Sequence, residues 1–265
     1  MNPVVARGLS KSFGSFVAVD GVDLDIAPGE VVGLVGANGA GKTTLIRMVL
    51  GLLEPTAGRI RLFGQPHSRE LRRRIGYVPQ NLGLYRDLTA AENIEFREET
   101  FGTAGRISRE FEQQTLVADL PLGTQRRAAF AAATHHDPEL LVLDEPTSGV
   151  SPLSRTLLWD LIRKRAESGA AVLVSTHYMD EAEQADRLVL MSRGRVAAAG
   201  LLDDIIGDRR IVEVRAERWA DAFAALDHDG RLLTLFGTNV RVIGESSTSV
   251  AAELDAAGVA AAVRS

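Results

Sequence analysis

The sequence predicts an α/β fold in which a parallel sheet carries a phosphate-binding loop, with a helical insertion and a small second domain. Three observations predict it. A glycine-rich turn lies between an apolar run and a helical pattern within residues 31–53. A second apolar run, residues 140–143, ends in the carboxylates Asp144 and Glu145. Strand and helix patterns then alternate, which is typical of a parallel sheet covered by helices.

The glycine-rich turn, residues 36–43, matches G-x-x-x-x-G-K-[ST] in full. A loop around a triphosphate turns its amide groups inward, which needs backbone angles that favour glycine. Strand, loop and helix occur in the order that the motif requires, which argues against a glycine-rich turn that binds nothing. We therefore expect a P-loop NTPase fold and ATP with Mg²⁺ as ligands. The expected phosphate contacts are Gly36, Ala37, Asn38, Gly39, Ala40, Gly41, Lys42, Thr43 and Thr44, with the Thr43 hydroxyl also ligating Mg²⁺.

Length and composition bound the remaining choices. A chain of 265 residues exceeds the usual size of one core, so we expect a large domain over residues 1–206 and a smaller one over 207–265. The net charge of -5 and pI near 5.6 weigh against a nucleic-acid partner. No cysteine is present, which excludes disulfides and thiolate metal sites. No apolar stretch approaches the roughly 20 residues that span a bilayer, and the first residues resemble no signal peptide, so we expect a cytosolic chain.

The first 80 residues predict antiparallel strands before the nucleotide core. Residues 3–9 and 17–26 alternate apolar with polar side chains. Between them we assign Phe13 to stacking on adenine, with Phe16 as the alternative and a core or turn role for Phe13 also open. After the loop the patterns predict a helix over 44–53, a strand over 59–63 and a helix over 68–74. The next strand ends at Gln80, whose side-chain carbonyl could ligate Mg²⁺ or orient water, although a surface glutamine would look the same.

Residues 81–136 predict an α-helical insertion. Helical patterns cover 89–100, 108–116 and 123–135, and no strand pattern interrupts them. The insertion closes at His135 and His136. Because no third ligand is near in sequence, we interpret this pair as a solvated helix end and not as a metal site.

Three side chains at strand ends carry the expected chemistry. Parallel strands deliver ligands at their carboxyl ends, so Asp144 would hold Mg²⁺ through water. Glu145, one residue on, is placed to accept a proton from an attacking water. His177 follows the strand over 171–175 and could donate a hydrogen bond to the γ-phosphate or to that water; a structural histidine is the alternative.

The last 59 residues, 207–265, show short elements in the order strand, helix, strand, strand, helix, strand. This order predicts a small ferredoxin-like α+β domain. No residue cluster in it carries chemistry, so we expect a structural or regulatory appendage.

Taken together, residues 4 to about 200 resemble the nucleotide-binding ATPase subunit of ABC transporters, which implies a RecA-like parallel sheet core. Residues 84–93 and 175–183 resemble the branch that powers ABC-2 type drug and polymer exporters. Six pieces follow the family order: Phe13, residues 36–43, Gln80, the signature segment over residues 120–124, Asp144 with Glu145, and His177.

The resemblance implies partners and a location. A second ABC ATPase subunit, identical or different, would form a head-to-tail dimer with two ATP molecules between the subunits. Each ATP would contact the phosphate-binding loop of one subunit and the signature segment of the other, here through Gly123. A separate transmembrane permease would contact residues 81–95, which places the chain at the cytoplasmic face of the cell membrane.

Four departures from the family pattern matter. The signature segment reads Leu120-Pro121-Leu122-Gly123-Thr124, where most members have Leu-Ser-Gly-Gly-Gln. Pro121 therefore lacks the serine hydroxyl and a backbone amide, which leaves Gly123 and the helix N-terminus as donors. Ser151 stands where the family usually has aspartate. The insertion is short, and the chain stops before the family's usual closing segment. These features suggest an asymmetric pair or half of a tandem protein, and two alternatives stay open: a nucleotide-binding module with little hydrolysis, or a soluble ABC ATPase without a permease.

Overall fold

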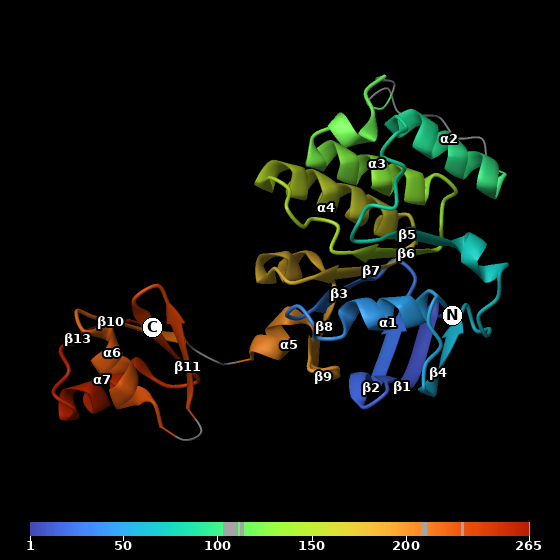
Figure 1. The fold of residues 1–265 in the computed structure, drawn as a ribbon. Helices are drawn as coiled ribbons and strands as arrows, with labels where there is room; N and C mark the ends of the chain where they lie inside the picture. The colour runs from blue at the N-terminus through green and yellow to red at the C-terminus, as the bar shows by residue number, and fades with distance from the viewer. Residues whose placement is uncertain (103–110, 112–113, 208–210, 229–230, 265) are drawn as a thin grey trace. The chain divides into compact units, whose positions relative to one another are not determined.

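The computed structural model describes residues 1–102, 111, 114–207, 211–228 and 231–264. They fall into two compact units, Met1–Leu202 and Asp203–Ser265. The division lies just before the boundary that the composition change indicates, at the start of the short helix α5 (Leu202–Ile206). Both units are drawn in Figure 1.

A six-stranded sheet forms the centre of the first unit, in the order β5-β6-β7-β3-β8-β9. Its pairs are parallel except for β8 with β9. The three strands β3, β6 and β7 are buried along their whole length, as expected for a parallel sheet that helices cover on both faces. The strands are β3 (Val31–Val35), β5 (Ile75–Val78), β6 (Leu140–Asp144), β7 (Ala171–Thr176), β8 (Arg187–Ser192) and β9 (Arg195–Gly200).

Helices cover the two faces of this sheet. The helix α1 (Lys42–Val49) lies on one side, and α3 (Leu122–Thr134) and α4 (Pro152–Glu167) lie on the other (Figure 1). Successive residues of β6 alternate between the two cores, because side chains along a strand point to opposite faces. Leu140 and Val142 belong to the core that contains α1, whereas Leu141 and Leu143 pack with α3 and α4. The apolar run of β6 thus contributes side chains to both cores.

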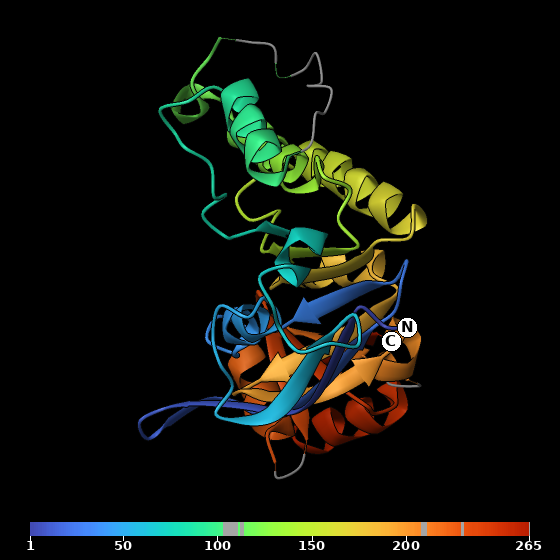
Figure 2. The same ribbon diagram turned by 90° about the vertical axis from the view of Figure 1, so that its right-hand side faces the viewer.

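The predicted antiparallel strands form a separate sheet, in the order β2-β1-β4. They are β1 (Val4–Phe13), β2 (Phe16–Ile26) and β4 (Ala57–Leu62). The first strand runs four residues further than its alternation indicates, because Gly14, at φ +60°, and Ser15 close a tight hairpin directly after Phe13. Figure 2 shows these strands at the opposite end of the unit from the helical insertion.

The insertion contains α2 (Ala90–Phe101), the 3₁₀ turn η3 (Val117–Asp119) and α3. The helix α2 begins with a capping box in which the side chains of Thr89 and Glu92 satisfy each other's amide groups. Most of the helix expected over 108–116 lies outside the described residues. The helix expected over 68–74 is a 3₁₀ turn, η1 (Leu71–Arg74), and a second 3₁₀ turn, η4 (Met179–Gln184), follows β7.

His135 and His136 do not form a solvated helix end. The ring of Phe101 stacks on His136, with centroids 4.1 Å apart and an interplanar angle of 21°, and meets the edge of His135. Burial, and to a smaller extent the neighbouring His135, lowers the pKa of His136 to about 4. The pair therefore packs the end of α3 against the end of α2.

Acid should weaken this packing. Between pH 6.5 and 4 the unfolded chain binds a proton at residue 136 that the folded chain does not, so the free energy of unfolding falls as the pH drops. The full pKa difference between the unfolded and the folded chain corresponds to about 3 kcal/mol of unfolding free energy. Partial exposure of His136 reduces this to about 2 kcal/mol.

We expect His136→Phe to remove about 2 kcal/mol of the stability difference between pH 7 and pH 4.5. Urea unfolding of both proteins, followed by Trp159 fluorescence in a Trp219→Phe background, measures it, because these are the two tryptophans of the chain. An identical pH dependence in the variant would contradict the assignment.

The second unit has the predicted ferredoxin-like order. Its four antiparallel strands lie in the order β11-β12-β10-β13, and α6 and α7 follow the first and third of them in sequence. The two helices share one core with the sheet, which contains Val212, Val242, Leu226 and Leu254. The elements are β10 (Ile211–Ala216), α6 (Trp219–Leu226), β11 (Leu232–Phe236), β12 (Asn239–Ile243), α7 (Ser247–Ala256) and β13 (Ala261–Arg264).

Candidate nucleotide-binding site

The phosphate-binding loop joins the end of β3 to the start of α1. Gly41 is the N-cap of α1 at φ +105°, and a Cβ on it would lie 2.5 Å from the Ala18 carbonyl oxygen. A Cβ on Gly36 would lie 2.5 Å from the carbonyl oxygen of Met191. Both positions therefore require glycine, and the first amides of α1 are left without intrahelical partners, as an anion site needs.

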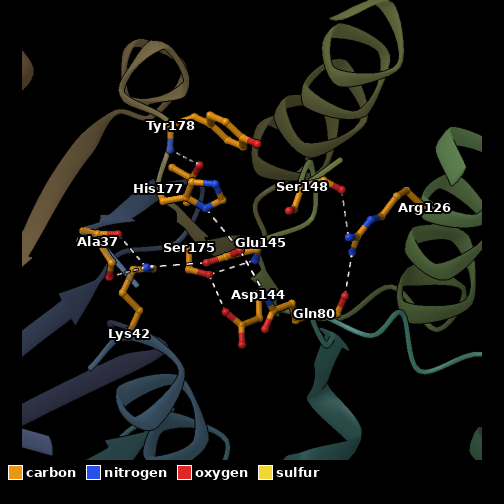
Figure 3. A network of polar contacts seen from close by, with 12 residues as sticks. Ala37, Lys42, Gln80, Arg126, Asp144, Glu145, Ser148, Ser175, His177 and Tyr178 are labelled. Atoms are coloured by element: carbon orange, nitrogen blue, oxygen red, sulfur yellow. Dashed lines mark hydrogen bonds and ion pairs between the residues drawn. The ribbon is translucent and has the colours of Figure 1, made fainter. Parts of the chain in front are cut away.

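Lys42 lies at the centre of this loop. Its side chain is 4% exposed, and Nζ donates hydrogen bonds to the carbonyl oxygens of Gly36, at 2.7 Å, and Ala37, at 3.1 Å. Nζ also lies 3.7 Å from Oε1 of Glu145 (Figure 3). The ammonium is thus held by neutral carbonyls and one carboxylate, a set of partners that phosphate oxygens can replace.

A cavity of about 320 Å³ opens beside the loop. It brings together side chains that are more than 100 residues apart in sequence. Its lining consists of Phe16, Ala18, Asn38, Gly39, Gly41, Lys42, Thr43, Thr44, Gln80 and Glu145.

A second hollow next to it contains the three expected magnesium ligands, Thr43, Gln80 and Asp144. They offer a hydroxyl, an amide oxygen and a carboxylate, which are the hard oxygen donors that Mg²⁺ prefers. No group of three or more histidine, cysteine or acidic residues forms a metal cluster within the described ranges. The donor set therefore fits Mg²⁺ that is shared with phosphate oxygens, and it does not fit a closed protein site.

Asp144 and Glu145 separate at the end of β6. Glu145 has φ +49°, so the chain turns sharply there, and the two carboxylates line different hollows. Ser175 on β7 holds both residues: its hydroxyl donates to Asp144 Oδ1 at 2.6 Å and accepts from the Glu145 amide at 2.9 Å. We did not predict Ser175, whose role follows from its position opposite Asp144 in the sheet.

Three side chains converge on the Glu145 carboxylate, which is 10% exposed. Gln80 Nε2 donates to Oε2 at 3.3 Å, and His177 Nδ1 lies 3.3 Å from the same oxygen. Lys42 approaches the other oxygen. The structure thus brings together the residues to which the sequence assigns phosphate binding, the catalytic base and water orientation (Figure 3).

Arg126 on α3 is a further residue that sequence reasoning missed. Its guanidinium is buried and donates to the carbonyl oxygens of Gln80 and Ser148, each at 3.1 Å. Burial lowers the pKa of this guanidinium. Arg126 therefore fixes the loop after β5 to the loop after β6. In the sequence it is one of two adjacent arginines in the polar first half of that helix, which gives no sign of this role.

The structure places Phe16, and not Phe13, at the cavity. The two rings flank the hairpin turn at opposite strand ends, and Phe16 appears in the lining whereas Phe13 does not. Phe13 instead lies under the ammonium of Lys11, 5.4 Å from its ring centroid. The ring given as the alternative thus lines the cavity, and the assignment of Phe13 to adenine stays a prediction.

The signature segment lies away from this cavity. Pro121 is the N-cap of α3, and its carbonyl accepts from the Thr124 and Gln125 amides. The amides of the first helical residues, Leu122 and Gly123, lack intrahelical partners. Gly123 packs so closely on α4 that a Cβ would lie 2.4 Å from Ser154 Oγ. These amides lie outside the lining of the cavity beside the phosphate-binding loop.

Comparisons with known proteins agree with this arrangement. Residues 19–148 match the sequence model of the family described as ABC transporter. Nod factor export ATP-binding protein I of Burkholderia orbicola (strain AU 1054) is 35% identical over 260 residues, which cover 92% of this chain and 84% of that protein. The chain belongs to the ABC transporter family.

A second ABC relative is the probable multidrug ABC transporter ATP-binding protein YbhF of Escherichia coli (strain K12). It is 39% identical over 241 residues, which are 85% of this chain but 42% of the relative, so the chain spans less than half of that protein's length.

Solved ABC structures share the fold. An ATP-binding subunit of an ABC transporter superposes with a TM-score of 0.69 at 28% identity, covering 76% of this chain and 91% of the other. A dimeric ATP-binding cassette in a post-hydrolysis state, bound to ADP and Pi, gives 0.66 at 26% identity, covering 75% and 98%. These matches confirm the predicted fold class. Among its described helices, this ABC protein has none with the length and apolar character of a bilayer span.

Proposed function

We propose that this chain binds ATP with Mg²⁺ and hydrolyses it to power a separate permease of an ABC-type exporter. The observation that carries the proposal is the convergence of Lys42, Gln80 and His177 on the Glu145 carboxylate, at the mouth of a complete phosphate-binding loop. An anion site, oxygen donors for a divalent cation and a candidate base occur in one cavity and its neighbour.

In this proposal the residues divide the work. The loop amides and Lys42 bind the phosphates, and Thr43, Gln80 and Asp144 hold Mg²⁺. When bound, Mg²⁺ neutralises the charge that develops on the transferred phosphoryl group. Glu145 takes a proton from the attacking water, and His177 donates a hydrogen bond to the γ-phosphate side of the site. Arrival of the phosphates draws Lys42 away from Glu145 and frees that carboxylate to act as a base.

A second ATPase subunit completes the site. The exposed N-terminus of α3 carries Gly123 away from the cavity of its own chain, as a segment donated to a partner would be. The dimeric cassette among the structural relatives supports such an assembly. Pro121 and Ser151 favour a second possibility, in which the partner is an unlike subunit with a Leu-Ser-Gly-Gly-Gln signature.

The permease contact is assigned to the start of the insertion. Tyr85 and Phe96 expose 52% and 45% of their surface and meet edge to face, with ring centroids 5.3 Å apart. The buried Asn93 holds the loop beneath them through hydrogen bonds with the Tyr85 amide and carbonyl and with the Thr89 carbonyl. Rigidly supported exposed aromatic side chains are typical interface anchors. Binding there would place the chain peripherally, at the cytoplasmic face of the membrane.

The exporter assignment rests on the relatives, which are named for multidrug transport and Nod factor export.

ATP turnover by the purified chain tests the proposal. We expect phosphate release that requires Mg²⁺ and stops with EDTA, together with a shift of the solution mass from monomer to dimer in ATP and Mg²⁺. ATP binding by an inactive monomer would contradict a self-sufficient motor. That result would favour the unlike partner, and adding such a subunit should then restore turnover.

A further inference from the structure

The first turn of α4 connects two functional segments. Ser151 caps the helix by accepting from the Ser154 amide at 3.3 Å. Ser154 lies against Gly123 of the signature segment, where space for a Cβ is lacking. Arg155, the next residue, faces the segment that follows His177. One helical turn thus contacts both the donated signature and the residues beside the catalytic histidine.

Arg155 makes three contacts with that segment. Its Nη1 donates to Asp180 Oδ2 at 2.8 Å, and its Nε lies 3.3 Å from Glu181 Oε1. Its guanidinium carbon lies 4.6 Å from the centroid of the Tyr178 ring. The Glu181 side chain is 1% exposed, and a carboxylate buried to that degree requires a cation nearby. Arg155 is therefore fixed over Tyr178 by charge on η4.

The Tyr178 ring in turn contacts the His177 ring. The two rings lie 4.1 Å apart with a tilt of 36°, and the Tyr178 amide donates to Thr176 Oγ1 at 3.0 Å. Figure 3 shows the Tyr178 ring beside His177, with the imidazole directed toward Glu145. The His177 side chain is 30% exposed, so core packing alone does not fix its ring. The Tyr178 face is what limits the imidazole on that side.

We propose that Arg155 is a positioning residue that holds the His177 imidazole toward Glu145 through the Tyr178 ring. The proposal rests on the hydrolytic function given above. It adds a route by which a displacement of the signature segment, at Gly123, changes the position of His177 in the chain's own site. Movement of α3 shifts Ser154, the same turn shifts Arg155, and His177 moves with Tyr178. The route does not use the side chain of residue 151, where the family's aspartate is replaced.

Two variants break the route at different points. Arg155→Lys keeps a positive charge for Asp180 and Glu181 but loses the planar group over the ring. Tyr178→Ala removes the ring and leaves both ion pairs. In each we expect kcat for ATP to fall about tenfold to a hundredfold, because a small misplacement of a catalytic group is costly, whereas KM should change less than about twofold.

Arg163→Met is the matched control. Arg163 lies on the same helix and donates to Gln184 of the same η4 turn at 2.9 Å, but it contacts neither Tyr178 nor His177. If Arg155 only fastened α4 to η4, both arginine variants would act alike. We expect the control to keep its kcat, and an equal loss in both would overturn the proposal.

Two further measurements separate positioning from folding. In a His177→Ala background, Arg155→Lys should cause no additional loss of turnover; the same fold-loss as in the parent would overturn the proposal. Imidazole NMR resonances of the five histidines, assigned with His177→Ala, should shift in Arg155→Lys and Tyr178→Ala for His177 selectively. An unmoved His177 resonance would likewise overturn it. The NMR result stands even if the parent chain hydrolyses no ATP, which would be a failure of the proposed function alone.

Discussion

Glu145→Gln is expected to abolish ATP turnover and to leave ATP binding intact. Glutamine keeps the shape of the side chain and its contact with Gln80, but it cannot accept the proton of an attacking water. Loss of a general base costs roughly a hundredfold to ten-thousandfold in rate. Binding should persist or tighten, since the substitution removes a negative charge from the cavity that receives the phosphates.

A matched control lies at the other end of the same strand. Glu139 immediately precedes β6 and pairs with Arg74 at 2.6 Å on the surface. Glu139→Gln makes the same chemical change far from the cavity and should retain turnover. Phosphate release and titration with a fluorescent ATP analogue measure the two effects separately. Hydrolysis by Glu145→Gln at a rate near that of the parent would remove Glu145 from its assigned role.

The phosphate-binding loop and β6 could be predicted because their chemistry is local. The requirement for glycine at residues 36 and 41 follows from close contacts with Met191 and Ala18, yet the spacing alone already reveals the loop. The uninterrupted apolar run of β6 reflects burial on both faces of the sheet, and the carboxylates come where the run stops. Such patterns can be recognised without information on the tertiary contacts of these residues.

Other parts of the site depend on pairing across the fold. Ser175 acquires its role because β6 and β7 align Asp144 with it, and a one-residue change of register would remove the contact. Arg126 becomes important only when α3 brings it between two loops. Phe13 and Phe16 differ in the direction in which a hairpin turn points them. A sequence pattern does not encode these relations, which explains why Ser175 and Arg126 were missed. The choice of the ring that stacks on adenine stays a prediction.

Lys42→Met is expected to weaken ATP binding by about a hundredfold to a thousandfold. Methionine fills a similar volume but supplies no charge, and each lost hydrogen bond between an ammonium and a phosphate is worth about 1.5–3 kcal/mol. At the lower part of this range, about 1.5–2 kcal/mol each, two such contacts correspond to a loss of about 3–4 kcal/mol in binding free energy. Calorimetric titration of ATP with Mg²⁺ measures the change, and an affinity within threefold of the parent would contradict the role of Lys42.

The same substitution should also reduce stability, and the two effects can be separated. In the free protein Lys42 lies 3.7 Å from the buried Glu145 carboxylate, so Lys42→Met leaves that charge with Gln80 and His177 alone. We expect the free energy of unfolding to fall by about 1–3 kcal/mol. Adding Glu145→Gln removes the unpaired charge and should recover this stability without recovering affinity. Recovery of both would mean that Lys42 acts by supporting the fold, whereas recovery of stability alone identifies its ammonium as a direct phosphate ligand.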